Sequence, residues 1–468
     1  MGLRIRRLFF GLLVWSCLCG GAKAELRSRV DGIINSSSQR KVEYGVVILK
    51  AGTGEVVYEH NSRKAMVPAS NMKVVVSAAA LRELGADYEF KTKVGVCGDT
   101  LVVIGGGDPL LGDEATDGKY GREDGWIFED IAGRLKQRGL KKVKDIIVDS
   151  TIFDDERVHP NWPKEQLNRD YACEVSGLNY NGNCVAVRAK AAGGKAAIFV
   201  EPETGYVEVT NKVKAITSGK GAIGSYRNKE ANKIIVFGKC RGEEGPFSVA
   251  IERPAAFFGF LLAERLAREG IETEGELVVK GVGTECRFRM VAEYSSGMGD
   301  VLGRCNKDSF GLAAESLLKT VGARRKGGGK NGSWAWGREA VAEYLAGLGA
   351  DEDEFYIDDG SGLSKENRLS ANAITKVLLD MYRKDWQLYK SSLAVGGTDG
   401  TIAKYFKEKR YIGRVMGKTG YVAGVKSFSG VCSTGGGDYI FSVLTNKANG
   451  RTRGEINEIA KAIVDEFE

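Results

Sequence analysis

The apolar residues near the start of the chain predict a strand hairpin followed by a buried helix. Residues Val42–Leu49 and Glu55–His60 are β-rich runs on either side of the turn sequence Ala-Gly-Thr-Gly, a spacing typical of a hairpin. The run Val74–Leu84 then consists mainly of Val, Ala and Leu. It predicts a helix that begins near Ser70, just after the rigid Pro68.

The middle and the end of the chain differ in the spacing of their apolar residues. From about Tyr88 to Arg289, short β-rich runs alternate with Gly-rich turns, and this change of texture predicts an inserted region. Beyond it the chain returns to longer amphipathic runs typical of helices. The strands expected in the middle are 93–96, 100–104, 144–148 and 234–237, with helices near 123–137 and 254–269. Elsewhere we expect helices at 25–35, 312–321, 338–348, 371–383 and 455–467 and strands at 426–432 and 439–444.

Composition and charge are those of a globular protein with more than one domain. The chain has 468 residues, of which 43% are hydrophobic and 28% charged, and its 63 Gly suit turn-rich β structure. The formal charge is +7, but four of the 68 basic residues lie in the first 24 residues, so 64 basic against 61 acidic residues leave +3. This small excess predicts neither a nucleic-acid partner nor a polybasic membrane surface.

The first 24 residues have the features of a secretory signal peptide. Three arginines precede an apolar run at 8–19 that is too short to span a bilayer, and Ala-Lys-Ala at 22–24 fits a small-x-small cleavage site. We therefore expect an exported protein that works in the periplasm or in another extracytoplasmic compartment.

The positions of the cysteines and histidines argue against a metal site and against a Ser-His-Asp mechanism. Seven cysteines follow the signal segment, at positions 97, 173, 184, 240, 286, 305 and 432. They contain no Cys-x-x-Cys pair, so we expect no metal site, and the sequence indicates no other cofactor. We expect buried thiols, with one or two disulfides as the alternative in an oxidising compartment. The only histidines are His60 and His159, and neither lies in a segment that suggests a Ser-His-Asp mechanism.

The candidate chemistry begins with Ser70 and Lys73. Residues three positions apart lie on the same face of a helix, so the amine of Lys73 can reach the hydroxyl of Ser70. A serine hydroxyl is a weak nucleophile until a base removes its proton, and a lysine kept neutral by burial and by the helix N-terminus is such a base. A capping Ser and a solvated Lys give the same pattern by chance, but the apolar residues that follow predict a buried helix.

A second pattern, Lys418-Thr419-Gly420, lies far downstream at the rim of a predicted strand. Gly417 and Gly420 would let a ligand approach the backbone closely. Ser-x-x-Lys followed by Lys-Thr-Gly is the signature of the serine penicillin-recognising enzymes, which comprise transpeptidases, DD-peptidases and β-lactamases.

Over nearly its whole length beyond the signal segment, the chain resembles one branch of these enzymes. That branch is the DacB-type D-alanyl-D-alanine carboxypeptidases/endopeptidases, the penicillin-binding protein 4 type of the class C low-molecular-mass penicillin-binding proteins. The matching stretches are 67–73, 105–110, 148–150, 153–154, 178–181, 306–309, 314–315, 359–364, 367–368, 399–401 and 418–420.

The resemblance implies an α/β (α+β) fold with a serine β-lactamase/DD-peptidase-like domain, in which helices flank an antiparallel sheet. Residues 25–90 and 290–468 would form this split penicillin-binding domain. Residues 91–289 would form a β-rich insertion of one or two small domains, the inner one at about 190–248.

The resemblance also implies catalytic roles. Ser70 would attack the carbonyl between the two D-alanines of a peptidoglycan stem peptide, and Lys73 would accept its proton. Ser309 would relay that proton to the leaving amine, since a hydroxyl both donates and accepts. β-Lactams would acylate the same serine.

Substrate binding would fall to the second pattern. Lys418 would supply positive charge and Thr419 a hydroxyl donor for the terminal carboxylate, next to Gly420. The backbone amides of Ser70 and Tyr421 would form the oxyanion hole.

Gly311 departs from the family pattern. The second motif of the family is Ser-x-Asn, and the corresponding residues here are Ser309-Phe310-Gly311. A missing amide contact costs about 1–3 kcal/mol if nothing replaces it. An active DD-peptidase is the reading we favour, and a catalytically impaired penicillin-binding or wall-binding protein is the alternative. A β-lactamase fits less well, because a long insertion separates the first two motifs. The sequence leaves open carboxypeptidase against endopeptidase preference, stem-peptide chemistry and oligomeric state.

Overall fold

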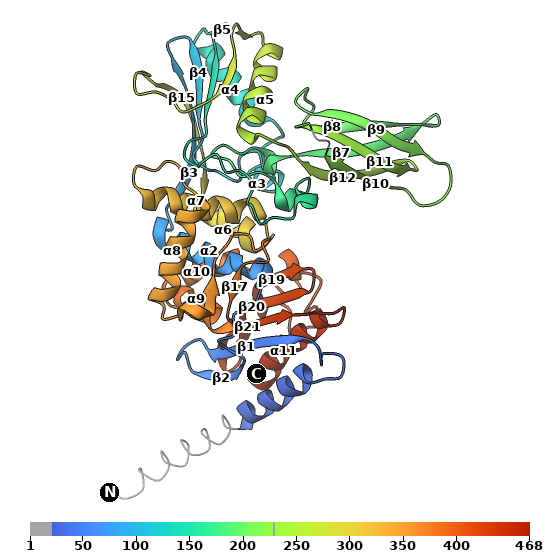
Figure 1. Ribbon diagram of the computed structural model, residues 1–468, viewed down its shortest axis with the longest axis vertical. Helices are drawn as coiled ribbons and strands as arrows, with labels where there is room; N and C mark the ends of the chain where they lie inside the picture. Colours follow the sequence, from blue (N-terminus) through green and yellow to red (C-terminus); the bar gives the residue numbers. More distant parts are fainter. Residues whose placement is uncertain (1–20, 228–229) are drawn as a thin grey trace, which may run out of the picture. The chain divides into compact units, whose positions relative to one another are not determined.

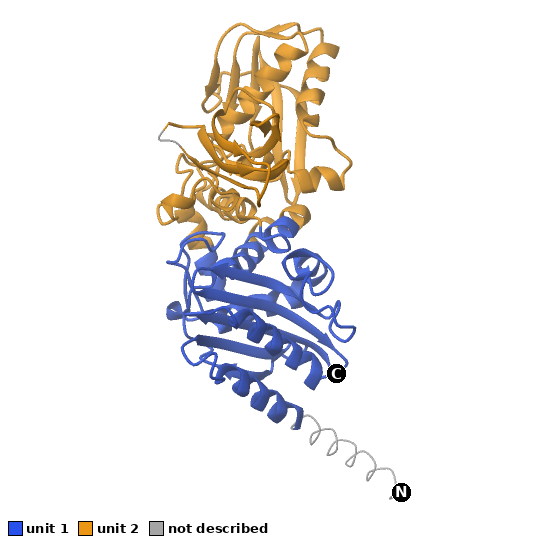
Figure 2. Cartoon of the chain, turned by 90° about the vertical axis from the view of Figure 1, so that its right-hand side faces the viewer, with its two compact units in different colours: residues 1–82, 302–309, 341–468 blue, residues 83–301, 310–340 orange. Residues whose placement is uncertain are grey.

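A computed structural model describes residues 21–227 and 230–468 of the protein. The chain forms two compact units, coloured separately in Figure 2. Of the described residues, the first unit contains 21–82, 302–309 and 341–468, and the second contains those within 83–301 and 310–340. Most of the predicted signal peptide lies outside the described residues, and residues 21–34 are helical.

The first unit is built on an antiparallel six-stranded sheet with the strand order β18-β19-β20-β21-β1-β2. The hairpin predicted near the N-terminus is present, and its first strand pairs with β21 near the C-terminus (Figure 1). The strands are β1 Glu43–Lys50, β2 Val56–His60, β18 Ala394–Val395, β19 Val415–Val422, β20 Val425–Thr434 and β21 Gly437–Asn446.

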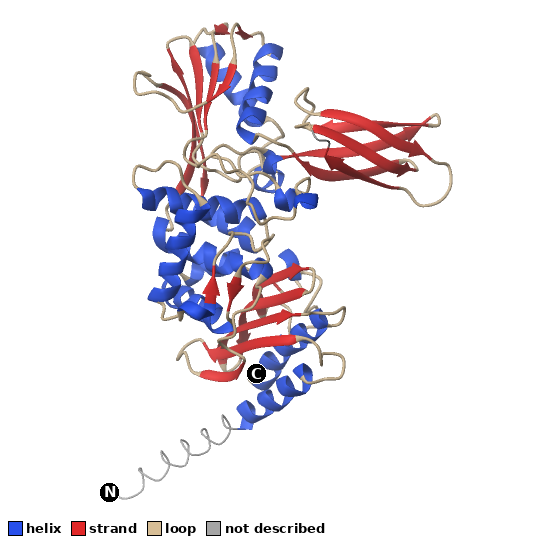
Figure 3. Ribbon diagram, viewed as in Figure 1, coloured by secondary structure: helices blue, strands red, loops and turns tan. Residues whose placement is uncertain are grey.

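Helices cover both faces of this sheet. Four consecutive residues of β1, Val46–Leu49, are buried, which requires apolar neighbours on each face because successive side chains alternate. Helix α9 (Ala371–Lys384) packs on β1 and β21, and α11 (Thr452–Glu466) packs on β20 and β21. Figure 3 colours the helices blue and the strands red. An antiparallel sheet flanked by helices confirms the predicted fold class.

The helices that the apolar periodicity predicted are present, with ends shifted by a few residues. In the part of the chain that the structure describes, none combines the length and apolar character needed to cross a bilayer. The remaining helices are α2 Met72–Leu84, α3 Glu114–Lys119, α4 Trp126–Gln137, α5 Pro254–Arg268, α6 Met298–Asn306, α7 Gly311–Lys326, α8 Trp334–Gly347 and α10 Trp386–Ser392.

The second unit contains a five-stranded sheet with the order β14-β6-β4-β3-β15 and two three-stranded sheets, β10-β11-β9 and β12-β7-β8. Most strands of the three-stranded sheets alternate exposed with half-buried positions and bury few side chains fully, so they form no continuous apolar run. The strands are β3 Glu89–Cys97, β4 Thr100–Ile104, β5 Lys142–Val143, β6 Ile146–Asp149, β7 Cys184–Ala192, β8 Lys195–Glu201, β9 Glu208–Ala215, β10 Ala222–Arg227, β11 Lys233–Cys240, β12 Glu243–Ala250, β13 Glu272–Thr273, β14 Leu277–Val279 and β15 Arg289–Gly297.

The two ends of the segment 89–297 lie side by side. Strands β3 and β15 pair antiparallel over their length, and the amide of Met298 donates to the carbonyl of Tyr88 at 3.0 Å. A disulfide joins Cys97 to Cys286, while the other five cysteines in the described residues are buried thiols. The expected buried thiols are therefore present, together with one disulfide of the kind given as the alternative.

The segment also has its own apolar core. One cluster of buried side chains is drawn entirely from residues 94–294, with aromatic residues such as Phe128, Phe257 and Phe258 at its centre. A segment with paired ends, an internal disulfide and a complete core has what an independent folding unit requires.

We expect the fragment of residues 89–297 to unfold cooperatively in urea when expressed alone and followed by circular dichroism. The matched control is residues 98–285, which lack β3, β15 and the disulfide and leave the five-stranded sheet without two of its strands. A broad, non-cooperative transition for the longer fragment would show that its core needs the rest of the chain.

Candidate active site

Ser70 lies in a single 3-10 turn, Ala69–Asn71, directly before α2. The side-chain nitrogen of Lys73 is 3.3 Å from the Ser70 hydroxyl and donates to the backbone carbonyl of Ser361 at 2.6 Å. The side chain of Lys73 is buried. The predicted Ser–Lys pair is therefore formed within one helical turn.

The backbone before Ser70 adopts a rare conformation. Ala69 has φ +47°, which is costly for a residue with a Cβ and is tolerated where packing over-determines it. The packing comes from Gly362, because a Cβ there would stand 1.9 Å from the Ala69 carbonyl oxygen. Asp359 holds this loop by accepting hydrogen bonds from the amides of Gly362 and Ser364. The loop thus fixes both the turn and the carbonyl that Lys73 contacts.

Lys418 lies inside β19, and its side chain is fully buried. Its ammonium group donates to the Ser309 hydroxyl and to the Thr419 carbonyl, each at 2.8 Å. Burial, and then the nearby charge of Lys73, lowers the pKa of Lys418 well below its usual range. The sequence placed Lys418-Thr419-Gly420 at the rim of a strand, whereas the structure places all three within it, because their glycines masked the β pattern.

Ser309 also has a positive φ, of +64°. The turn is fixed from outside, since Thr401 donates its amide to the Lys307 carbonyl at 3.2 Å and the Lys307 ammonium pairs with Asp399 at 2.7 Å. The backbone is therefore strained at Ala69, which precedes Ser70, and at Ser309 itself. Such strain is common where a precise geometry serves a function.

Asn71 connects the turn that carries Ser70 to the sheet. Its side-chain amide donates to the Lys418 carbonyl at 2.8 Å, and its oxygen accepts from the Ser429 hydroxyl at 2.5 Å. Asn71 is fully buried, and Ser429 also contacts Ser442 at 2.8 Å. Sequence reasoning missed this role, because Asn is the second residue of a Ser-x-x-Lys pattern whose middle positions carry no signal.

Gly420 allows β19 to approach the turn that carries Ser70. A Cβ at this position would stand 2.9 Å from the Pro68 carbonyl oxygen and 3.0 Å from the Ser70 amide nitrogen. The sequence suggested that this glycine gives room to a ligand, whereas in the structure the room is filled by the protein's own backbone and by the hydroxyl of Ser427, which donates to Pro68 at 2.7 Å.

The remaining predicted site residues lie as follows. The Thr419 hydroxyl contacts the Thr401 hydroxyl at 3.1 Å. The Tyr421 side chain is 70% exposed, so only its backbone can serve a buried oxyanion. Gly311 is buried as the first residue of α7, and the ring of the preceding Phe310 lies beside Gly182.

The comparisons with known proteins identify the family. Residues 26–465 match the model of the D-Ala-D-Ala carboxypeptidase 3 (S13) family. The chain belongs to this family. It is 30% identical over 461 residues to a D-alanyl-D-alanine carboxypeptidase of an Actinomadura species, covering 92% of this chain and 82% of that protein.

Solved structures share the fold of this S13 member. Penicillin-binding protein 4 (dacB) of Haemophilus influenzae superposes with a TM-score of 0.78 at 22% identity, covering 93% of this chain and 98% of that one. A predatory peptidoglycan endopeptidase of Bdellovibrio bacteriovorus gives a TM-score of 0.53 at 17% identity, covering 91% and 94%. The DacB-type resemblance is confirmed, and the family is one of serine DD-peptidases, so the protein is a hydrolase.

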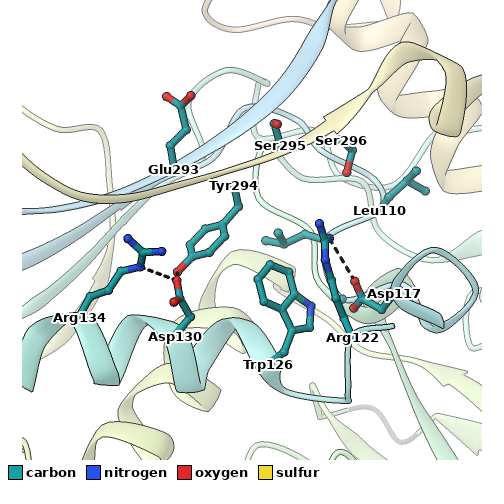
Figure 4. Close-up of a pocket in the computed structure, with 12 residues that line it drawn as sticks. Leu110, Asp117, Arg122, Trp126, Asp130, Arg134, Glu293, Tyr294, Ser295 and Ser296 are labelled. Atoms are coloured by element: carbon teal, nitrogen blue, oxygen red, sulfur yellow. Dashed lines mark hydrogen bonds and ion pairs between the residues drawn. The ribbon is translucent and has the colours of Figure 1, made fainter. Parts of the chain in front are cut away.

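A separate pocket of about 370 Å³ lies within the second unit and contains none of the predicted site residues (Figure 4). Its charges are matched internally. Arg122 pairs with Asp117 at 3.5 Å, and Asp130 accepts from Arg134 at 2.6 Å and from the Tyr294 hydroxyl at 2.8 Å. A pocket whose cations are already neutralised by carboxylates offers a charged ligand little net attraction.

We expect Asn71→Ala to lower the free energy of unfolding by about 1–3 kcal/mol, because it leaves the buried Lys418 carbonyl without its amide donor. The control is Ser442→Ala, which removes only a hydroxyl contact to Ser429. Urea unfolding of both variants measures the difference. Equal stability of the two variants would mean that Asn71 does not hold the turn against β19.

Proposed function

We propose that the protein is a serine-type D-Ala-D-Ala carboxypeptidase/endopeptidase that cleaves peptidoglycan stem peptides through an acyl-enzyme on Ser70. The observation that carries the proposal is the Ser70–Lys73 pair, with 3.3 Å between hydroxyl oxygen and amine. A nucleophile and a base within hydrogen-bond reach are the minimum that acyl transfer needs.

Acylation of Ser70 requires two proton transfers. Lys73 takes the proton of Ser70 as the oxygen attacks the carbonyl carbon of the penultimate D-alanine. When the tetrahedral intermediate collapses, the C–N bond breaks and the leaving amine gains a proton through Ser309. In deacylation, water attacks the ester carbonyl as Lys73 takes one of its protons, and that proton passes to Ser70 Oγ when the ester C–O bond breaks and the shortened peptide leaves as an acid.

Lys418 suits a role in this proton path better than the carboxylate-binding role suggested by its sequence motif. Its amine contacts Ser309 at 2.8 Å and is buried with a strongly lowered pKa. A neutral amine both donates and accepts, so it can hold the Ser309 hydroxyl in either orientation during transfer.

The oxyanion would be stabilised by the backbone amides of Ser70 and Tyr421. Gly420 supports this proposal, since its lack of a Cβ lets β19 run within close reach of the Ser70 amide. Two amides fixed before the reaction lower the barrier without reorganising as charge develops.

The relatives support the substrate class. The Actinomadura protein is named a D-alanyl-D-alanine carboxypeptidase and the Bdellovibrio protein a peptidoglycan endopeptidase. The Haemophilus protein has been solved with a β-lactam. We infer that this chain acts on the same class of D-Ala-D-Ala peptides outside the cytoplasm and that β-lactams acylate it. We also propose that residues 91–289 are an insertion in a split penicillin-binding domain formed by 25–90 and 290–468, with the inner insert at about 190–248.

Ser70 is expected to carry the acyl group. Intact-mass measurement after incubation with benzylpenicillin should show one adduct on the wild-type protein and none on Ser70→Ala. Ser77→Ala, seven residues further along the same helical segment, is a matched control that should still be labelled. An adduct that persists in Ser70→Ala would place the nucleophile elsewhere.

Substitutions at Gly311 test whether the missing Asn side chain of the family motif limits kcat/KM. Gly311→Asn should raise kcat/KM for diacetyl-Lys-D-Ala-D-Ala by roughly tenfold, the effect of one added hydrogen bond. Gly311→Ala adds a Cβ without an amide and should give no gain. Loss of activity in both variants, with folding intact, would mean that the buried start of α7 requires glycine.

A further inference from the structure

A cationic pocket of about 670 Å³ opens beside β19 in the first unit. It shares Thr419 and Tyr421 with the candidate active site. Lys404, Lys426 and Arg453 contribute its charge, and no Asp or Glu lines it. Unlike the pocket of the second unit, this one therefore keeps its positive charge for a ligand.

Arg453 lies in the first turn of α11 and is the most firmly placed of the three cations. Its guanidinium donates to the Gly420 carbonyl at 2.8 Å and to the Ser427 carbonyl at 3.1 Å. In the described part of the chain it forms no ion pair, and burial lowers its pKa. A guanidinium has five N–H donors, so three remain beyond these two bonds. A partly buried cation without a counter-ion is costly until an anion binds.

The two lysines add to the positive field. Lys426 donates to the Asn449 carbonyl at 2.6 Å, and its pKa is lowered by burial and then by Arg453. Lys404 is exposed, with its ammonium 5.3 Å from the centre of the Tyr405 ring. Neither forms an ion pair with a carboxylate among the residues that the structure describes.

The pocket reaches β19 close to the point where this strand approaches the Ser70 backbone. Arg453 holds the carbonyl of Gly420, and a Cβ on that glycine would be 3.0 Å from the amide nitrogen of Ser70. Lys418, in contrast, has its amine bound to Ser309 and to the Thr419 carbonyl and is fully buried. The charge available to a substrate near Thr419 therefore comes from this pocket.

We propose that this pocket binds the carboxylate of the residue on the leaving side of the scissile bond, with Arg453 as the main specificity-determining residue and Lys404 and Lys426 as supporting cations. The inference rests on the proposed DD-peptidase function and extends it. In this proposal the pocket binds the free terminal carboxylate of the substrate. Arg453, and not Lys418, is the residue that recognises this carboxylate.

The test compares two thioesters that differ only in this group, N-benzoyl-D-alanyl thioglycolate and its methyl ester. Wild type should prefer the free acid. Arg453→Gln should lower kcat/KM for the acid about tenfold or more, because a charge-assisted hydrogen bond is lost, and leave the methyl ester within about twofold. Raised salt should reduce the preference of wild type in the same direction.

Arg451→Gln is the matched control, since it removes the same charge two residues earlier from an exposed position. It should keep the wild-type preference for the acid. The deciding quantity is kcat/KM for the free acid divided by kcat/KM for the methyl ester, here called the acid-to-ester ratio. Equal acid-to-ester ratios in Arg453→Gln and Arg451→Gln would overturn the inference. Failure of wild type to cleave either thioester would instead overturn the proposed function.

If Arg453→Gln does not fold, Lys404→Gln is the variant that tests the proposal. Within the described residues the Lys404 ammonium contacts only an aromatic ring, so its replacement should leave the fold intact. It should lower the acid-to-ester ratio about threefold, as expected for a screened charge. An unchanged ratio in this variant would contradict the proposal, and rescue of the ratio by Arg453→Lys would support a charge effect.

Discussion

The candidate site depends on the close approach of β19 to the turn that carries Ser70. Gly420 permits the approach, since any Cβ there would collide with the Pro68 carbonyl and crowd the Ser70 amide. Asn71 then donates a hydrogen bond from the turn to the Lys418 carbonyl, so one buried side chain sets the position of Ser70 relative to the strand. Backbone contacts of this kind hold reacting groups more precisely than flexible side chains do, which is what preorganised acyl transfer requires.

This approach has an electrostatic consequence. It brings two buried lysines into one site, and the charge of Lys73 adds to burial in lowering the pKa of Lys418. Each amine contacts a hydroxyl, Ser70 for Lys73 and Ser309 for Lys418. Two like charges in a site of low polarity oppose each other, so a proton added to one amine weakens the hold of the other. Such a pair favours proton movement between hydroxyls over permanent binding of an anion.

The sequence predicted the parts of the fold that follow from regular apolar spacing. The hairpin at 42–60, the strands 426–432 and 439–444 and the long helices are present, because burial on defined faces imposes a period on the residues. Strand β19 escaped this reasoning, since its glycines serve close packing and not a periodic apolar face. The roles of Asn71 and of the loop around Ser361 were also out of reach, because their partners lie hundreds of positions away in the sequence. Ser-x-x-Lys specifies its own geometry within one helical turn, and long-range polar contacts do not.

In the proposed mechanism, the division of charge around β19 would separate proton transfer from carboxylate recognition, two tasks that a single lysine performs poorly. A group that moves protons must be able to lose its charge, which burial next to a second amine favours. A group that recognises a carboxylate must keep its charge, and arginine does so even when partly buried. The structure places a buried lysine beside Ser309 and an arginine against the carbonyls of Gly420 and Ser427, both fixed by the same strand. Because β19 connects them, a change that moves the strand would disturb proton transfer and carboxylate recognition together.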